Sequence, residues 1–295
     1  MNAGGGTRRS RYAGLAYVAP ALLFVAVFVL FPLGRLIHLS LTNASLLGGS
    51  RFVGIANYTK AFNDPVFWQA LRFTIRYTIY ITPILMGLGF VFALLTAAAH
   101  PLAKAARSAI FLPVVIGLGT SSLLWFWLLD EQVGLINRVL MDLGLIAHPL
   151  VWWVDADMGL WGVIISVTWK VVGFGTIIFV AAIQSIDPEI IDAAKIDGAD
   201  YWQRVGRVLL PLATRSILLT TLVSAVGSML AFDQFYIMTA GGPRSLTFTS
   251  VYWMYQNSFI YFKLGYGAAL ALILVVIIFV GATAQIVLTR KRSRQ

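Results

Sequence analysis

Long apolar runs separated by short polar segments dominate the hydrophobic pattern of this chain. Six runs each hold about the 20 mostly apolar residues that a helix needs to cross the hydrocarbon core of a membrane. Within each run the apolar residues are continuous rather than alternating, which favours helices over the strands of a membrane barrel. We therefore predict an all-α integral membrane protein with six transmembrane helices, at about residues 14–38, 73–98, 109–129, 159–184, 216–238 and 265–288.

The first run follows three arginines, Arg8, Arg9 and Arg11, and so begins as a secretory signal peptide does. Its apolar core, from Leu15 to Leu33, is longer than the h-region of such a peptide, and no A-x-A cleavage site follows it. We therefore interpret this run as a retained transmembrane helix.

Lysine and arginine are distributed unequally between the segments that connect the runs. One side comprises the tail 1–13, the loop between the second and third runs, the loop 185–212 with Arg215 just after it, and the basic tail 289–295, with 13 basic residues against five on the other. Because cytoplasmic segments carry this excess, both termini are expected in the cytoplasm. The larger set is Arg8, Arg9, Arg11, Lys104, Arg107, Lys195, Arg204, Arg207, Arg215, Arg290, Lys291, Arg292 and Arg294, and the smaller is Arg51, Lys60, Arg138, Arg244 and Lys263.

Composition agrees with a multi-pass membrane protein, since 59% of the residues are hydrophobic, 12% are charged and the mean hydropathy is +0.83. The net charge of +10 gathers beside apolar runs, which indicates membrane topology rather than nucleic-acid binding. The absence of cysteine excludes disulfides and thiolate metal sites. The histidines (His38, His100 and His148) lack metal-ligand spacing, and Gly117-Leu118-Gly119 lacks the Lys-Ser/Thr of a phosphate loop. We predict no catalytic or metal site, and no enzymatic activity for this chain.

Aromatic residues are frequent in the predicted outer segments, 39–72, 130–158 and 239–264, and beside them. An interfacial aromatic belt explains this distribution, and a platform for stacking sugars is the alternative. The residues are Trp68, Trp152, Trp153, Trp161, Tyr252, Trp253, Tyr255 and Tyr261.

The predicted cytoplasmic loop 185–212 has helix signals of its own. Asp187-Pro188 predicts a helix start, with the aspartate as N-cap and proline at the first helical position. Gly198 predicts the end of that short helix, and a second helix is expected to run to Pro211, where the fifth run begins. Composition alone favours the alternative, a solvated amphipathic loop.

The stretch Asp192-Ala193-Ala194-Lys195-Ile196-Asp197-Gly198-Ala199, followed by Val208-Leu209-Leu210-Pro211, resembles the E-A-A-x-x-x-G and I-x-L-P signature of membrane subunits of bacterial ATP-binding-cassette importers. Asp192 departs from the usual Glu but keeps the charge. Three outer segments resemble the outer loops of the carbohydrate-uptake branch of this family, the maltose and glycerol-3-phosphate type. Within that branch the chain resembles the maltose transporter's larger permease subunit, but it lacks that subunit's extra N-terminal spans and large periplasmic insertion. They are Phe52-Val53-Gly54-Ile55-Ala56-Asn57-Tyr58 with Phe67-Trp68-Gln69-Ala70-Leu71, Gly134-Leu135-Ile136-Asn137 and Thr239-Ala240-Gly241-Gly242-Pro243.

The resemblance implies a type I importer permease fold that forms half of a translocation path for a sugar or related solute. Implied partners are a second permease subunit, two copies of a cytoplasmic ABC ATPase, which would use ATP and Mg, and an extracytoplasmic solute-binding protein. No cofactor would be bound by this chain. In the family the loop is a coupling helix, which here assigns ATPase coupling to Asp192, Ala193, Ala194, Lys195, Asp197, Gly198 and Ala199.

The resemblance also places the substrate path on one helix before the loop and one after it. Each set follows i, i+3, i+4, i+7 spacing and so occupies one helix face, although tight helix packing also explains the small second set. The charge of Lys170 is expensive inside a span and would face solute or pair with Asp233. Carried over by position, the sets are Val167, Lys170, Val171 and Phe174, then Ser224, Gly227, Ser228 and Ala231.

Two other function classes stay open at this point. A secondary transporter or channel would work without an ATPase, and it usually carries an inverted repeat, which is not evident here. A membrane enzyme would need clustered acids, which Asp192, Asp197 and Asp200 only imitate. For an importer we expect a neutral sugar rather than a phosphoester.

Overall fold

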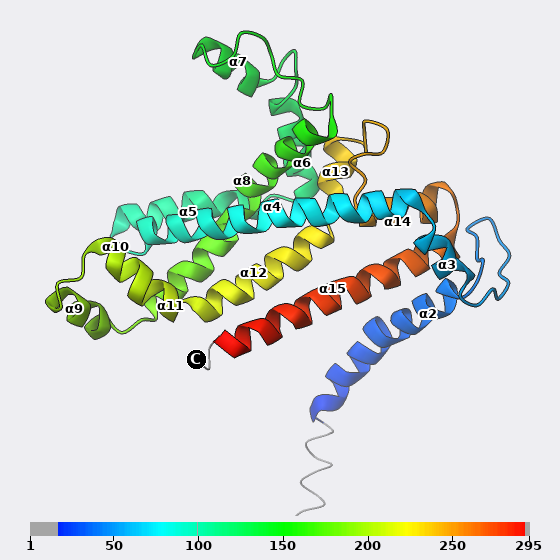
Figure 1. The fold of residues 1–295 in the computed structure, drawn as a ribbon, viewed down its shortest axis with the longest axis horizontal. Coiled ribbons are helices and arrows are strands. Elements are labelled where there is room, and N and C mark those ends of the chain that lie inside the picture. The colour runs from blue at the N-terminus through cyan, green and yellow to red at the C-terminus, as the bar shows by residue number, and fades with distance from the viewer. Residues whose placement is uncertain (1–16, 99, 293–295) are drawn as a thin grey trace, which may run out of the picture. The chain divides into compact units, whose positions relative to one another are not determined.

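A computed structural model describes residues 17–98 and 100–292, without the side chains of 288–292, and its regular elements in this part are helical apart from one isolated bridge between Thr42 and Phe52 (Figure 1). The chain divides into two compact units. The first comprises the described residues up to Asp64 together with Met254–Val275, and the second comprises Pro65–Trp253 with the described residues from Val276 on.

The first unit begins with a continuous apolar helix, Tyr17–Ser40, whose last part is the π-helical η1 (Ala26–Leu30) and α2 (Phe31–Ser40). None of its most apolar 18-residue stretch is buried. The chain then folds back on itself through Asn57, at the start of α3 (Ala56–Phe62), whose amide donates to the carbonyls of Ser40 at 2.8 Å and Thr42 at 2.7 Å. The unit continues through η3 (Gln256–Ile260), which follows α14 (Ser250–Tyr255), to the start of α15 (Leu264–Arg292).

The second unit is built around α8 (Ala156–Gln184), a long helix that packs against α4 (Pro65–Thr96), α5 (Pro101–Val115) and α12 (Thr214–Met229) (Figure 1). One part of its core joins Ala93 of α4 to Phe179, Val180 and Ile183 of α8, all buried. The close approach of α8 to α5 depends on Gly173, because a Cβ at this position would lie 2.8 Å from the Cα of Phe111 and closer still to the carbonyl oxygen of Ile110.

The predicted third span, 109–129, is not one helix. It consists of the end of α5 and of α6 (Leu118–Leu128), which meet at an angle of 99°. Ile116 and Gly117 between them are extended, with ψ of 137° and 145°. Pro113 supplies no N–H to the helix and so weakens its last turn, which explains where α5 ends. The continuous apolar run did not reveal this break, because hydropathy records the environment and not the backbone angles.

The predicted fifth span, 216–238, is also divided. Helix α12 ends at Met229, and after three non-helical residues the chain forms a separate short helix, α13 (Asp233–Met238). At the other end, α12 meets α11 (Leu210–Leu212) at Ala213, where the helix Tyr201–Leu212 and α12 form an angle of 69°. The other predicted spans correspond to single helices with ends shifted by up to eight residues.

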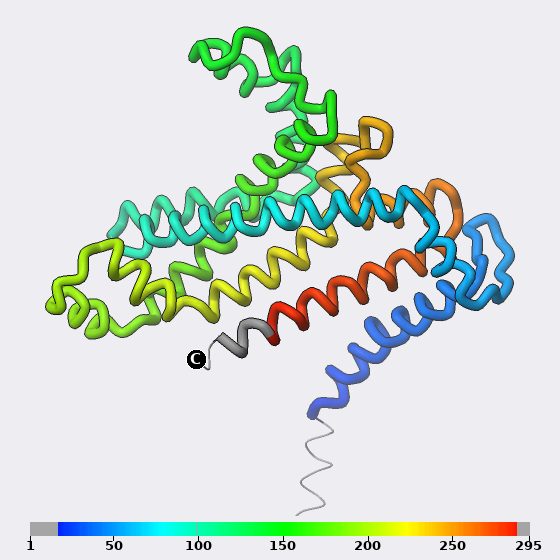
Figure 2. The backbone as a smooth tube through the Cα atoms, viewed as in Figure 1, coloured from blue at the N-terminus to red at the C-terminus, as the bar shows by residue number. Residues whose placement is uncertain are grey.

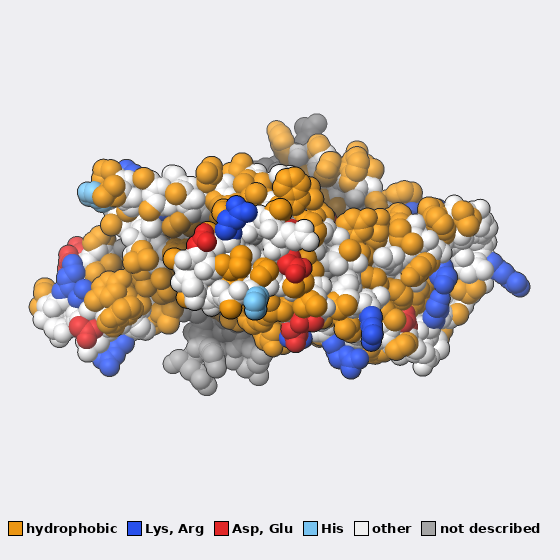
Figure 3. Space-filling model, turned by 90° about the horizontal axis from the view of Figure 1, so that it is seen from above, with side chains coloured by type: hydrophobic (Ala, Val, Ile, Leu, Met, Phe, Trp, Pro, Cys, Tyr) orange, Lys and Arg blue, Asp and Glu red, His pale blue; other side chains and the backbone are white. Residues whose placement is uncertain are grey.

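Four described helices are long and apolar enough to cross a membrane, and the two bent pairs bring the number to six if each pair is one span. The apolar residues on their surfaces agree with a lipid environment, as Leu112, Val115 and Trp127 are 68%, 75% and 73% exposed. Hydrophobic side chains are widely distributed over the face drawn in Figure 3. The count of six crossings and the side of each terminus stay predictions.

Candidate functional site

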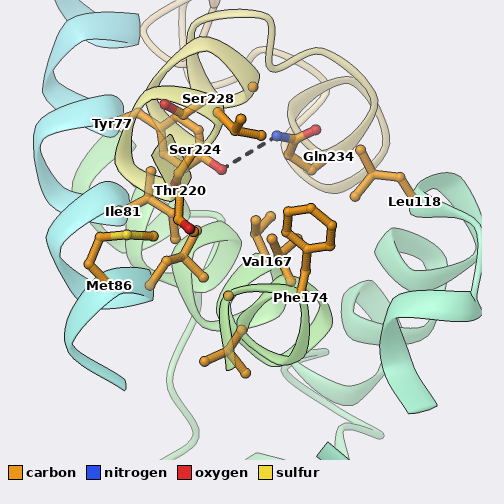
Figure 4. Close-up of a pocket in the computed structure, with 16 residues that line it drawn as sticks. Tyr77, Ile81, Met86, Leu118, Val167, Phe174, Thr220, Ser224, Ser228 and Gln234 are labelled. Carbon is orange, nitrogen blue, oxygen red and sulfur yellow. Dashed lines mark hydrogen bonds between the residues drawn. The ribbon is translucent and has the colours of Figure 1, made fainter. Parts of the chain in front are cut away.

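A pocket of about 250 Å³ lies within the second unit, between α4, α8, α12 and the ends of α6 and α13 (Figure 4). Apolar side chains form most of its wall. Its lining residues are Tyr77, Ile81, Leu85, Met86, Leu118, Val167, Val171, Val172, Phe174, Gly175, Thr220, Val223, Ser224, Gly227, Ser228 and Gln234.

The few polar atoms of this pocket are incompletely paired. The amide nitrogen of Gln234 donates to the hydroxyl of Tyr77 at 3.5 Å (dashed in Figure 4), whereas the Gln234 Oε1 and the Ser224 Oγ are buried without a partner in the described part of the chain. A buried polar atom without a partner costs about 1–3 kcal/mol. Such atoms in a mostly apolar pocket are typical of a site that is completed by a ligand or by water.

Six of the eight predicted path residues line this one pocket. Helix α8 contributes Val167, Val171 and Phe174, and helix α12 contributes Ser224, Gly227 and Ser228. Three of the four residues of each set, which were carried over from the resemblance, therefore lie together at one pocket. The α12 face also takes part in helix packing, because the Ser228 hydroxyl donates to the Thr78 hydroxyl of α4 at 3.0 Å. Their contact with a solute stays a prediction.

Lys170 and Ala231, the other two predicted residues, do not line the pocket. Lys170 is 9% exposed and lies on the side of α8 that faces α5, where its ammonium donates to the Val114 carbonyl at 3.4 Å. The ion pairs that the structure forms among its described residues are Arg76–Asp157 and Asp192–Lys195, so Lys170 and Asp233 do not pair. Ala231 lies beyond the end of α12, where its carbonyl accepts from the Thr249 hydroxyl at 2.7 Å.

Tyr77, Ile81 and Leu85 of α4 were missed by sequence reasoning, as was Gln234 of α13. The three α4 residues recur every four positions, a spacing that any buried helix face also shows. Gln234 did carry a signal, because an amide within an apolar run is unusual and marks a position that faces other protein groups or a cavity.

The predicted coupling segment forms the elbow that its sequence indicates (Figure 2). Helix α9 (Pro188–Ile196) begins at Asp187, whose carboxylate accepts from the Glu189 N–H at 3.0 Å. It ends in a Schellman motif: the N–H of Ala199 donates to Ala194 and that of Gly198 to Lys195, both at 3.0 Å. Gly198 has a φ of +79°, which glycine adopts without strain.

A second short helix, α10 (Tyr201–Arg204), follows immediately. Asp200 and Gln203 form a capping box at its start, with hydrogen bonds of 2.7 and 3.1 Å. The chain then continues through the π-helical η2 (Val205–Leu209) and α11 to the bend at Ala213. The second helix thus ends one residue after the predicted Pro211, because the helical conformation continues through the proline to Leu212.

No residue of α9 is buried. Two large apolar side chains of this segment are strongly exposed, Ile196 at 87% and Trp202 at 75%. Asp192 and Lys195 are joined by an ion pair of 2.7 Å on the same helix. A short helix without any buried face gains no packing energy from its own chain, so its surface is available to a partner.

Among residues 17–98 and 100–292 the structure forms no cluster of three or more metal-ligating His, Asp or Glu side chains. The turn at Thr239–Pro243 is ordered by short hydrogen bonds: the Thr247 hydroxyl donates to the Gly242 carbonyl at 2.7 Å and lies 2.8 Å from the Thr239 hydroxyl. Gly241 has a φ of +76° and lies directly against the ring of Phe248.

The chain matches the model of a protein family, described as "Binding-protein-dependent transport system inner membrane component", over residues 10–294. It is 33% identical over 285 residues to the lactose transport system permease protein LacF of Rhizobium radiobacter, an alignment that covers 95% of each chain. It is 30% identical to the sulfoquinovosyl glycerol transport system permease protein SmoG of Agrobacterium fabrum, over 90% of this chain and 86% of that one. A chain of the bacterial alginate ABC transporter, crystallised with an alginate pentasaccharide-bound periplasmic protein, has the same fold, with a TM-score of 0.85, 18% identity and 97% coverage of both chains.

Proposed function

Because the chain belongs to the family of binding-protein-dependent transport system inner membrane components, we propose that it forms half of the translocation path of a sugar importer, with the α4–α8–α12 pocket as part of that path. The family accounts for its place in the inner membrane and for its role as the permease component of an ABC importer, in which ATP is hydrolysed by a separate subunit. The solute, the partners and the roles of individual residues are the parts that we propose.

The observation that carries this proposal is the pocket itself. Two polar atoms, Gln234 Oε1 and Ser224 Oγ, are buried there without a partner among the described residues, near the hydroxyl of Tyr77. Hydroxyl groups of a carbohydrate both donate and accept hydrogen bonds, and so they suit an amide and two hydroxyls. The lining residues are mostly apolar and include no charged side chain, which favours a neutral sugar over a phosphoester.

The names of the relatives favour a sugar or a related solute. They include permeases for lactose, for sulfoquinovosyl glycerol and for starch degradation products, and one for sn-glycerol-3-phosphate. A panel of labelled solutes offered to whole cells, with competition by unlabelled ones, tests the class. Uptake of neutral sugars is expected, and uptake confined to phosphoesters would contradict it.

The residues 187–211 are proposed to couple this chain to the ATPase. Helix α9 has no buried residue, and Ile196 and Trp202 expose large apolar surfaces beside it. Exposed apolar groups grouped on one short segment are typical of a protein contact. The coupling role is assigned to Asp192, Ala193, Ala194, Lys195, Asp197, Gly198 and Ala199, and the assembly would contain a second permease subunit, two ATPase copies and an extracytoplasmic binding protein.

Substitution of Gly198 tests this role. In Gly198→Asp a side chain is added at a φ of +79° and on the proposed contact surface. Gly144 offers a matched control, because it ends α7 (Leu135–Asp142) with the same hydrogen-bond pattern, a φ of +68° and equally open surroundings. Strain at the helix end is therefore the same in Gly144→Asp, and only the location differs.

The measurement is co-purification of the tagged chain from its native host, with mass spectrometry of the associated proteins. We expect a second permease and a soluble ATPase with the wild type and with Gly144→Asp, and much less ATPase with Gly198→Asp, together with loss of uptake. Recovery of the chain alone, with undiminished uptake, would contradict the importer assembly and favour a secondary transporter or channel that needs no ATPase. Equal ATPase recovery with both variants would contradict the coupling role alone.

A further inference from the structure

A second cavity, outside the proposed path, forms an apolar groove on the opposite flank of α8. Its volume is about 630 Å³, within the range of small-molecule sites. It lies in the angle between α5 and α6, which diverge by 99°. Its lining residues are Ile84, Leu88, Phe92, Ala109, Ile110, Pro113, Trp125, Trp161, Ile164, Ile165, Thr168, Trp169 and Val172.

Two stripes of side chains lead into this groove from one end of the helices. On α4 the residues Arg76, Tyr80, Ile84, Leu88 and Phe92 recur every four positions and therefore share one face. On α8 the residues Asp157, Trp161, Ile165 and Trp169 do the same. Both stripes thus change from charged, through aromatic, to apolar in the same direction.

The two stripes contact each other at matched levels. The Arg76 guanidinium pairs with the Asp157 carboxylate at 2.6 Å and lies over the ring of Tyr80 at 5.6 Å. The rings of Tyr80 and Trp161 are stacked, with centroids 5.7 Å apart. The groove begins at Trp161. The site is therefore charged at one end, aromatic next to it and apolar beyond. A phospholipid has the same order, with a charged headgroup, an interfacial region and an apolar acyl chain.

The side chains at the entrance are accessible, as those of Arg76 and Asp157 are 41% and 67% exposed. A guanidinium has five N–H donors and a carboxylate has two acceptor oxygens, so one ion pair leaves both groups with further capacity. Deeper in the groove, the Trp125 Nε1 and the Thr168 Oγ1 are buried without a partner in the described part of the chain.

We propose that this groove holds one phospholipid with a zwitterionic ethanolamine headgroup. Its phosphate lies on Arg76, its primary ammonium on Asp157, and one acyl chain fills the channel between α4, α5 and α8. The adjacent opposite charges of Arg76 and Asp157 match the adjacent phosphate and ammonium of this headgroup. Phosphatidylglycerol supplies no cation for Asp157, and the quaternary ammonium of phosphatidylcholine supplies no N–H donor. The headgroup end is the end of α8 away from the coupling segment.

The test is a competition between lipids. The complex purified through a tag on this chain is reconstituted in vesicles with equal amounts of phosphatidylethanolamine, phosphatidylglycerol and phosphatidylcholine, extracted in mild detergent, and analysed by native mass spectrometry. We expect one retained phosphatidylethanolamine for each copy of this chain. Retention of the three lipids in proportion to the vesicle composition would overturn the proposal.

Two variants separate the headgroup from the acyl chain. In Asp157→Asn the remaining charge is that of Arg76, so the ratio of retained phosphatidylethanolamine to phosphatidylglycerol is expected to fall about tenfold, as for loss of one charged hydrogen bond. In Ala109→Phe a ring is added to an exposed alanine of the groove wall, and retention of all three lipids is expected to fall. Ala105→Phe is the control, because Ala105 is exposed on the same helix but does not line the groove.

Unchanged lipid retention in Ala109→Phe would contradict the proposal. If Ala109→Phe instead released a second permease subunit from the purified complex without changing lipid retention, the groove would be a contact between subunits and the lipid assignment would be wrong. A third outcome is normal lipid retention in both phenylalanine variants but a changed ratio of phosphatidylethanolamine to phosphatidylglycerol in Asp157→Asn. The lipid would then bind at the charged pair but outside the groove, and the proposal would also be overturned.

Discussion

Gln234 donates through its side-chain amide to the buried hydroxyl of Tyr77, although 156 residues separate them in the chain. This bond joins α13 to α4 across one end of the pocket. The ring of Tyr77 also packs edge-to-face on Phe235, at 5.1 Å between centroids. The polar end of the pocket is therefore held by packing as well as by hydrogen bonding.

Removal of the hydroxyl in Tyr77→Phe is expected to weaken solute uptake without unfolding the chain. The ring contact with Phe235 is kept, whereas the Gln234 amide loses its acceptor, at a cost of about 1–2 kcal/mol in solute binding, or five- to thirtyfold in apparent affinity. The measurement is the concentration dependence of uptake in cells. Tyr80→Phe is the control, because Tyr80 does not line this pocket, and an equal effect of the two variants would contradict the assignment.

Loss of the N-cap of α9 is expected to weaken coupling to the ATPase strongly, although the cap contributes little to the stability of the helix. Asp187→Ala removes the acceptor of the Glu189 N–H and should cost about 1 kcal/mol of local helix stability. Since α9 has no buried face, this loss should appear as faster amide exchange over the helix and as weaker stimulation of the ATPase by solute.

Asp155→Ala provides the matched comparison for that variant. Asp155 is the N-cap of α8 and accepts from Asp157 and Met158, both at 2.8 Å. The same chemistry is lost there, but α8 is held by extensive packing against α4, α5 and α12. Coupling should therefore be preserved, and a parallel loss in both variants would show that the effect is not local to α9.

Replacement by alanine should destabilise the protein at one glycine of the spans and leave its stability almost unchanged at another. Gly173→Ala places a methyl group against the Ile110 carbonyl and 2.8 Å from the Phe111 Cα, so it must separate α8 from α5, at a cost of about 1–3 kcal/mol. Gly227→Ala meets nothing within 4 Å and should leave stability almost unchanged. Thermal unfolding in detergent distinguishes them, and similar midpoints for both variants would contradict the close approach.

The loop between α6 and α7 should lose its local order in acid. The backbone N–H groups of Val133 and Gln132 donate to Asp130 and hold the pKa of its carboxyl below the ordinary value. The folded pKa is depressed, so this stabilisation is present above the ordinary carboxyl pKa, about 3.9, and is lost as the pH falls through the folded value. Protection factors of the two amides should decline in that range, and Asp130→Asn should abolish the decline.

Local structure could largely be predicted from the sequence. Asp187-Pro188 and Gly198 specify the start and end of α9 through side-chain and backbone hydrogen bonds between near neighbours, which no distant contact has to supply. Val167, Val171 and Phe174, which the resemblance placed together, do share one face of α8, since a 3.6-residue period determines which residues share a face.

Tertiary structure decided which way each face points and where a helix breaks. Lys170 was placed with the predicted path residues by the resemblance, yet Gly173 brings α5 close to α8 on that side, and the lysine faces the Val114 carbonyl instead. The division of the run 109–129 into α5 and α6 was equally hidden, because lipid and protein interior give the same hydropathy signal. Tyr77 and Gln234 meet only after α4 and α13 have packed. The sequence by itself determined the helical segments, the caps of α9 and the elbow that follows it, which depend on neighbours in the chain. The pocket and the helix breaks depend on contacts between distant segments and were decided by packing.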